Sequence, residues 1–138
     1  MAGYISFSFN INDPEFSSQT TVVNPNSPYY VSHVFIRTPI YDNVGVKIGY
    51  KVSDDYVQQL SPTEYSVRIS STYYIENQGT INWSYSFINN KPSHFYPIGV
   101  LASSNITSTT GNFFGKTGAV ALMPNKDGSR NVTIAFNF

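Results

Sequence analysis

Apolar and polar residues alternate with a period of two along most of the chain. The stretch 4–11, YISFSFNI, places large apolar side chains at every second position and Ser or Asn between them. The same alternation recurs over 44–52, 64–75, 80–87 and 131–138. Because successive side chains of a β-strand point to opposite faces, this pattern predicts strands with one buried side and one side facing solvent.

Less regular apolar stretches predict further strands at 19–23, 29–37, 97–104 and 112–122. Segments rich in Gly, Pro, Asn and Asp separate the strands, such as NPNSP at 24–28 and ENQG at 76–79. Only 53–62, SDDYVQQLSP, is expected to hold a helical turn, capped by Ser53 or Asp54. Eight or nine strands with short turns predict one all-β domain over 1–138. Its expected form is an eight-stranded antiparallel β-barrel, with a β-sandwich or jelly roll as the alternative.

The composition narrows the classes of partner. Aromatic residues make up 16% of the chain and charged residues 12%, and the net charge is zero. A basic patch for nucleic acid or an anionic membrane is therefore not expected. There is no cysteine, so thiol chemistry is excluded. No signal peptide or membrane helix is recognisable, and we expect an intracellular protein.

The segment TTGNFFGKTG at 109–118 resembles the end of a phosphate-binding loop, G-x-x-x-x-G-K-[ST]. Thr110 stands where that motif has its first glycine. A phosphate-binding loop also needs a helix directly after it, and Pro124 leaves too few residues for one. The glycines instead predict bends in the penultimate strand of a curved sheet, with Phe113 or Phe114 turned inward and Lys116 in solvent.

The same segment, TGNFFGKTGAV, resembles the G-x-[FY]-x-x-x-x-G-x-[VA] signature of allene oxide cyclases and plant dirigent proteins. YDNVGVKIGYKV, STYYIENQGTINWSYSF and RNVTIAFNF resemble further strands of this superfamily in the same order, so the resemblance covers about residues 40–138. It implies an eight-stranded antiparallel barrel. The family's Gly-Gly-Thr-Gly is here Ser108-Thr109-Thr110-Gly111, and the catalytic residues of the family find no match, so its chemistry is not carried over.

Classical catalytic groups are sparse. His33 lies in a predicted strand and His94 in a Pro-flanked turn, and their spacing predicts no metal site. We expect His33 on a strand face and His94 at the surface or rim. Asp54 and Asp55 look like a helix-cap or loop pair. No cofactor, metal or catalytic residue is predicted.

The aromatic residues carry the most information about function. On the apolar faces they either fill the barrel or line a cavity for a hydrophobic small molecule. In the second case the predicted pocket comprises Tyr50, Tyr65, Tyr73, Trp83, Tyr85, Phe113 and Phe136.

Two functions remain open. One is a barrel that binds an apolar small molecule, with a cofactor-free activity like that of a cyclase or dirigent protein, which would favour one reactive conformer. The other is a non-catalytic structural or assembly protein, for example of a virus, that uses the barrel to oligomerise. In both cases we expect a homo-oligomer.

Overall fold

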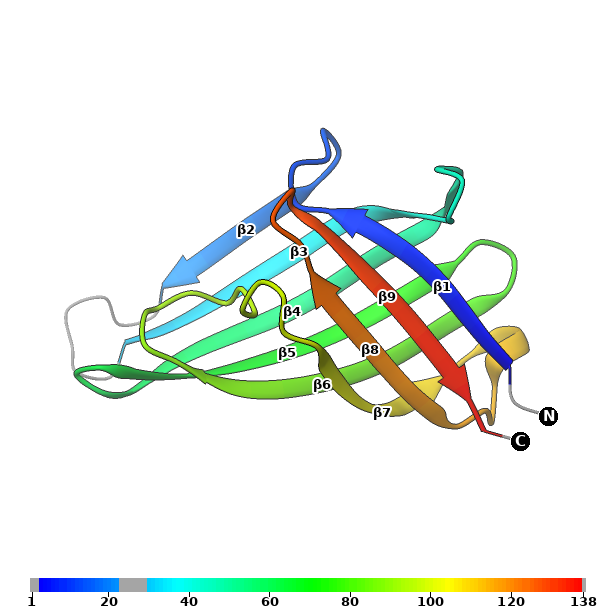
Figure 1. Ribbon diagram of the computed structural model, residues 1–138. Coiled ribbons are helices and arrows are strands. Elements are labelled where there is room, and N and C mark those ends of the chain that lie inside the picture. Colours follow the sequence, from blue (N-terminus) through cyan, green and yellow to red (C-terminus); the bar gives the residue numbers. More distant parts are fainter. Residues whose placement is uncertain (1–2, 23–29, 138) are drawn as a thin grey trace.

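The computed structural model describes residues 3–22 and 30–137. This part of the chain forms one nine-stranded antiparallel sheet and a single 3₁₀ turn (Figure 1). The strands are β1 (Gly3–Asn10), β2 (Ser17–Val22), β3 (Val31–Tyr41), β4 (Lys47–Ser61), β5 (Glu64–Ile75), β6 (Gly79–Asn89), β7 (Ala102–Thr109), β8 (Gly118–Pro124) and β9 (Ser129–Phe136), and the turn is η1 (Gly111–Phe113).

The sheet closes on itself to form a barrel. The strands follow the order β1-β9-β8-β7-β6-β5-β4-β3, and β1 returns to β3 through the pair Ser8 and Tyr41. Where β1 leaves β3, the extra strand β2 pairs with the rest of β3, from Ser17 opposite Arg37 to Val22 opposite Ser32. The predicted eight-stranded antiparallel barrel is confirmed, and the sandwich alternative is not what forms.

The barrel has one wide end. β6 pairs with β5 as far as Asn89, but β7 pairs with β6 only between Ile81 and Trp83. The inner face of β4, β5 and β6 therefore continues beyond the shorter strands of the opposite wall (Figure 1). The segment 90–101, which joins β6 to β7, lies across this wide end, and we name it the mouth segment.

Two apolar clusters fill the barrel. The larger one contains Trp83, Tyr73 and Phe7, which are at most 2% exposed. The indole Nε1–H of Trp83 donates a hydrogen bond of 3.0 Å to the Tyr73 hydroxyl. The buried polar groups of the two largest core side chains are thus hydrogen-bonded to each other. The smaller cluster, Val57, Val67 and Ile69, occupies the wide end. Tyr73, Val67, Ile69 and Trp83 lie on the apolar sides predicted from the alternation in β5 and β6, and Phe7 lies on the side predicted for 4–11. Val57 lies in the segment 53–62, for which a helical turn was predicted.

Three predictions of secondary structure are wrong, and so is the buried side predicted for 44–52, where Val52 is exposed and Lys51 is buried. The segment 53–62 holds no helical turn, because β4 runs unbroken from Lys47 to Ser61. The strand predicted at 97–104 begins at Ala102. The strand predicted at 112–122 begins only at Gly118 and follows η1. The turn predicted at 24–28 lies outside the described residues.

The TTGNFFGKTG segment is thus the connection between β7 and β8 rather than a kinked strand. Phe113 is buried at 5% exposure and its ring stacks on Phe136, whereas Phe114 points outward at 81%. Gly118 has a φ of +151°, and a Cβ there would lie 2.0 Å from the Ala135 carbonyl oxygen. The glycine is needed for close approach of β9. No helix in the described residues is long and apolar enough to cross a membrane.

Candidate functional site

A layer of polar side chains crosses the interior between the two apolar clusters. Lys51, Ser53 and Asp55 occupy successive inward positions of β4, and Arg130 faces them from β9. All four are buried, with exposures between 2% and 7%. Buried charges are rare because desolvation disfavours them unless they are paired. Such a layer in a barrel of this size is therefore the first candidate for a functional site.

The mouth segment brings a histidine to this layer. His94 Nδ1 lies 2.7 Å from Asp55 Oδ2. The Asp55 carboxylate has only acceptor oxygens, so His94 Nδ1–H donates. This fixes the tautomer and leaves the lone pair of Nε2 available as a base. An aspartate that orients a histidine in this way is the arrangement used for general acid–base catalysis.

Several groups of the layer retain hydrogen-bonding capacity. Asp55 Oδ1 is buried without a hydrogen-bond partner among the described residues. The Lys51 ammonium lies 4.3 Å from the centre of the Phe9 ring, and no carboxylate of the described chain is within 4 Å of it. Burial lowers the pKa of Lys51 to about 8, against a smaller opposing effect of Asp55. Burial, then the negative charge of Asp55, raises the pKa of the Tyr85 hydroxyl, which stays protonated.

These groups surround a small cavity of about 30 Å³ beneath the mouth segment. This volume suits one water molecule, and it lies well below the roughly 300 Å³ typical of a ligand pocket. A larger hollow of about 530 Å³ lies at the barrel mouth and shares Ile11, Phe95, Tyr96 and Arg130 with the cavity. We name it the mouth hollow; its other lining residues are Asn12, Asn89, Lys91, Ser93, Pro97, Ile98, Asn125, Lys126 and Gly128.

Three segments shape the mouth hollow. The turn after β1 meets the β8–β9 turn, where Asn12 Nδ2 donates to the Asp127 carbonyl oxygen at 3.3 Å. Gly128, with a φ of +90°, allows this contact, because a Cβ there would lie 2.5 Å from Asn12 Nδ2. The mouth segment forms the third side. Its Tyr96 packs edge-on against Tyr85, with ring centres 5.6 Å apart.

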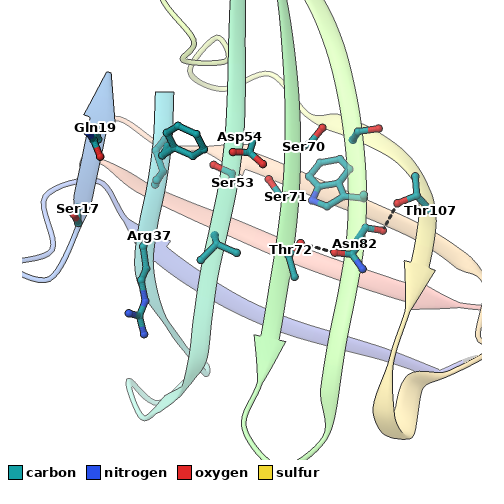
Figure 2. Close-up of a pocket in the computed structure, with 15 residues that line it drawn as sticks. Ser17, Gln19, Arg37, Ser53, Asp54, Ser70, Ser71, Thr72, Asn82 and Thr107 are labelled. Carbon is teal, nitrogen blue, oxygen red and sulfur yellow. Dashed lines mark hydrogen bonds between the residues drawn. The ribbon is translucent and has the colours of Figure 1, made fainter. Parts of the chain in front are cut away.

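A third hollow, of about 460 Å³, lies on the outer face of β2 to β6. We name it the outer groove. Figure 2 shows that small polar side chains from adjacent strands line it, among them Ser17, Ser70, Thr72 and Asn82. These polar groups form hydrogen bonds with one another: Thr72 Oγ1 donates to Asn82 Oδ1, and Thr107 Oγ1 donates to the Asn82 carbonyl oxygen. Asp54 of the outer groove pairs with His33, but this pair lies on the exposed outer face. We place the functional site at the mouth, where the His94–Asp55 pair adjoins buried charges.

The seven aromatic residues predicted to form one pocket are not brought together. Four of them, Tyr73, Trp83, Phe113 and Phe136, belong to the larger packed cluster. Tyr65 and Tyr85 lie at the wide end against the smaller cluster, and only Tyr85 lines the interior cavity.

Tyr50 lies apart from the other six. It is on the outer face, where Arg37 and Lys47 both stack on its ring.

The sequence interpretation missed the polar layer. Asp55 is an inward strand residue rather than part of a helix cap, and His94 is held by Asp55 rather than placed freely at the rim. His33 lies on a strand face as expected, where Nε2 donates to Asp54 Oδ1 at 3.2 Å. The register of the β4–β5 hairpin indicates which side of β4 is buried. Lys51 pairs with Tyr73 and Asp55 with Ile69. Paired residues point to the same face of the sheet, so Lys51 and Asp55 share the predicted apolar side of β5.

Comparison with solved structures finds the same barrel in proteins of very different sequence. A pyocyanin demethylase superposes with a TM-score of 0.65 at 10% identity, covering 98% of this chain and all of that chain. AbnU, an exo-specific intermolecular Diels-Alderase, superposes with a TM-score of 0.62 at 13% identity. The match covers 99% of this chain and 96% of that chain. No family model and no curated protein sequence matches the chain. At such identities the similarity establishes the fold, and the assignment to the allene oxide cyclase and dirigent superfamily stays a prediction.

Proposed function

We propose that this barrel binds a largely apolar small molecule at its mouth, with the reacting part of the ligand directed into the polar layer. The observation that carries the proposal is the continuity of the site. The mouth hollow has ligand size, and Arg130, Phe95 and Tyr96 line both it and the cavity at Asp55. A ligand that displaces part of the mouth segment would reach Asp55 Oδ1 and His94. Concave, mostly apolar sites with a few convergent polar groups are typical of small-molecule binding.

The activity we propose is cofactor-free and rests on proton transfer. His94 Nε2 takes a proton from the bound ligand, while Asp55 holds the ring and stabilises the imidazolium that forms. The Tyr85 hydroxyl, kept protonated by burial, donates a hydrogen bond to the oxygen on which negative charge develops. Enclosure by the mouth segment favours one conformer of the ligand, as a cyclase- or dirigent-like activity requires.

Binding is tested with phenylnaphthylamine, an uncharged dye that fluoresces in apolar sites. We expect saturable one-to-one binding to the wild type and a loss of about tenfold or more in Ile98→Glu. The substitution replaces part of the apolar wall with a carboxylate, and the uncharged dye would have to desolvate that carboxylate without forming an ion pair with it. Val100→Glu is the matched control: Val100 is a similarly exposed aliphatic residue of the mouth segment that does not line the hollow. Absence of saturable binding, or equal loss in both variants, would refute the mouth site.

Proton transfer has a separate test, deuterium incorporation at the benzylic carbon of phenylpyruvate in heavy water, followed by NMR. The wild type should exchange this proton about a hundredfold faster than buffer, as is typical of a positioned base. His94→Gln should lose the acceleration, because its amide cannot take up the proton. His33→Gln, which removes the histidine of the outer face, should retain it. Exchange at the buffer rate in the wild type would refute catalysis and leave binding in place.

Self-association is a second candidate function, favoured by one specific observation. The outer edge strand β2, SSQTTV, is exposed throughout and contains no charge, proline or break in register. Edge strands are normally protected by such features against pairing with another chain. If β2 pairs with β2 of a second copy, light scattering should show a dimer. The variant Thr20→Lys, or the double variant Thr20→Lys/Thr21→Lys, should convert this dimer to a monomer. A strict monomer at high concentration would exclude this candidate.

A further inference from the structure

The charged side chains that line the mouth hollow are all basic, and the acidic Asp127 lies next to them in the β8–β9 turn without lining it. Lys91, Lys126 and Arg130 line it, and none of its lining residues is acidic. Lys51 lines the adjoining interior cavity, so half of the eight basic residues of an overall neutral chain gather at this end of the barrel. Composition does not explain this concentration, because the acidic residues equal the basic ones in number.

Arg130 is the centre of this positive region. Arg130 is buried, with 7% of its surface exposed. Its Nη1 donates a hydrogen bond of 2.9 Å to the Gly128 carbonyl oxygen. Its guanidinium carbon lies 5.6 Å from the centre of the Phe95 ring. No carboxylate of the described residues is within 4 Å of it. A guanidinium has five N–H donors, so most of its capacity is unused at the point where mouth hollow and cavity meet.

The interior behind Arg130 does not supply the missing negative charge. Lys51 and Arg130 face a single carboxylate, that of Asp55, and one of its oxygens is taken by His94. Tyr85 and Tyr96 also line the cavity, and burial keeps the Tyr85 hydroxyl protonated. Desolvation lowers the pKa of Arg130, against smaller opposing effects of Tyr85 and Asp127. It also lowers the pKa of Lys51, against a smaller opposing effect of Asp55. Acidic groups of the described residues therefore compensate the burial of these two cations only in part.

Apolar side chains also line the mouth hollow, beside the uncharged polar residues Asn12, Asn89, Ser93 and Asn125. Ile11, Phe95, Tyr96, Pro97 and Ile98 supply these parts of its wall, and the Phe95 ring lies beside the Arg130 guanidinium. Flat apolar surface beside an unpaired guanidinium suits a ring system that carries an acid group, because a carboxylate or sulfonate accepts two parallel N–H bonds from arginine.

We propose that the ligand of this barrel is an apolar, ring-sized molecule with one acidic group, and that Arg130 binds the acid while Phe95 and Tyr96 hold the rings. The proposal rests on the proposed function and adds the chemical class of the ligand. Lys91 and Lys126, both exposed, would attract the anion from solution and contribute less to its binding, since solvent screens exposed charges.

Two dyes with the same ring system test this inference. Anilinonaphthalene sulfonate carries a sulfonate, and phenylnaphthylamine does not. We expect the wild type to bind the sulfonate about tenfold more tightly, and Arg130→Gln to remove this preference while changing the affinity for the uncharged dye less than about twofold. Arg68→Gln, which removes an exposed arginine that stacks on Tyr56, should change neither affinity.

The outcomes separate the two levels of the proposal. If neither dye binds saturably, the proposed function fails. If both bind with equal affinity, or if Arg130→Gln weakens both equally, the acidic-ligand inference fails and the binding site stands. Each variant is first compared with the wild type by Trp83 fluorescence and thermal unfolding. Should Arg130→Gln not fold, the double variant Lys91→Gln/Lys126→Gln decides: it should weaken only the sulfonate dye, by about threefold, and unchanged affinity refutes the inference.

Discussion

The buried ammonium of Lys51 makes a quantitative prediction about the pH dependence of stability. Burial lowers its pKa from 10.5 to about 8 in the folded protein, which corresponds to about 3 kcal/mol of destabilisation when the group is charged. The folded protein therefore releases this proton near pH 8 and the unfolded chain only near pH 10.5. Between these values the unfolded chain binds more protons, so the free energy of unfolding rises with pH.

The size of the effect follows from the two pKa values. From about pH 7 to about pH 9 the contribution of Lys51 to the free energy of unfolding should rise by about 1.3 kcal/mol. The buried Tyr73 and Tyr85 act in the opposite direction, because burial raises their pKa, but their effect begins above about pH 10, where tyrosines of the unfolded chain ionise.

The assay is urea unfolding followed by the fluorescence of Trp83, the single tryptophan, which is buried in the core. The free energy of unfolding of the wild type minus that of Lys51→Met should rise by about 1.3 kcal/mol over this pH range. Lys47→Met is the control. A hydrogen bond to Tyr50 raises the pKa of Lys47, so its contribution is lost only above about pH 10. A wild-type-minus-Lys51→Met difference that stays constant with pH would show that the ammonium is not desolvated.

Two further predictions concern the core and the β7–β8 connection. Tyr73→Phe leaves the buried indole N–H of Trp83 without its hydrogen-bond acceptor. The free energy of unfolding should fall by about 1–3 kcal/mol in the same urea assay. A loss below about 0.5 kcal/mol would mean that the indole finds another partner. Gly118→Ala should prevent folding or cost more than about 3 kcal/mol, because φ is +151° and the added Cβ would lie 2.0 Å from a carbonyl oxygen. Gly115→Ala, with a φ of +80° and no atom near the added Cβ, should cost only about 1 kcal/mol; similar losses at the two positions, measured by thermal unfolding, would contradict the steric explanation.

Period-two alternation predicts structure well wherever the inward side of a strand is apolar. Tyr73 and Trp83 were both assigned to apolar strand faces from the pattern alone, and they form the centre of the core. The pattern was misleading in β4, where the apolar Val52 points outward and Lys51 points inward. Alternation reports which residues share a side of a strand, and only the apolar character of one side tells which side is buried.

The sequence by itself therefore determined most of the strands, an all-β antiparallel fold and the core side chains of β5 and β6, because these depend on local periodicity and turn chemistry. The functional site depends on contacts between distant parts of the chain. Asp55 meets His94 from the mouth segment and faces Arg130 from the last strand only because barrel closure and the short β7 leave a wide end for the mouth segment to cover. Charged residues are buried there against their intrinsic preference, so only the tertiary structure decided that they belong together.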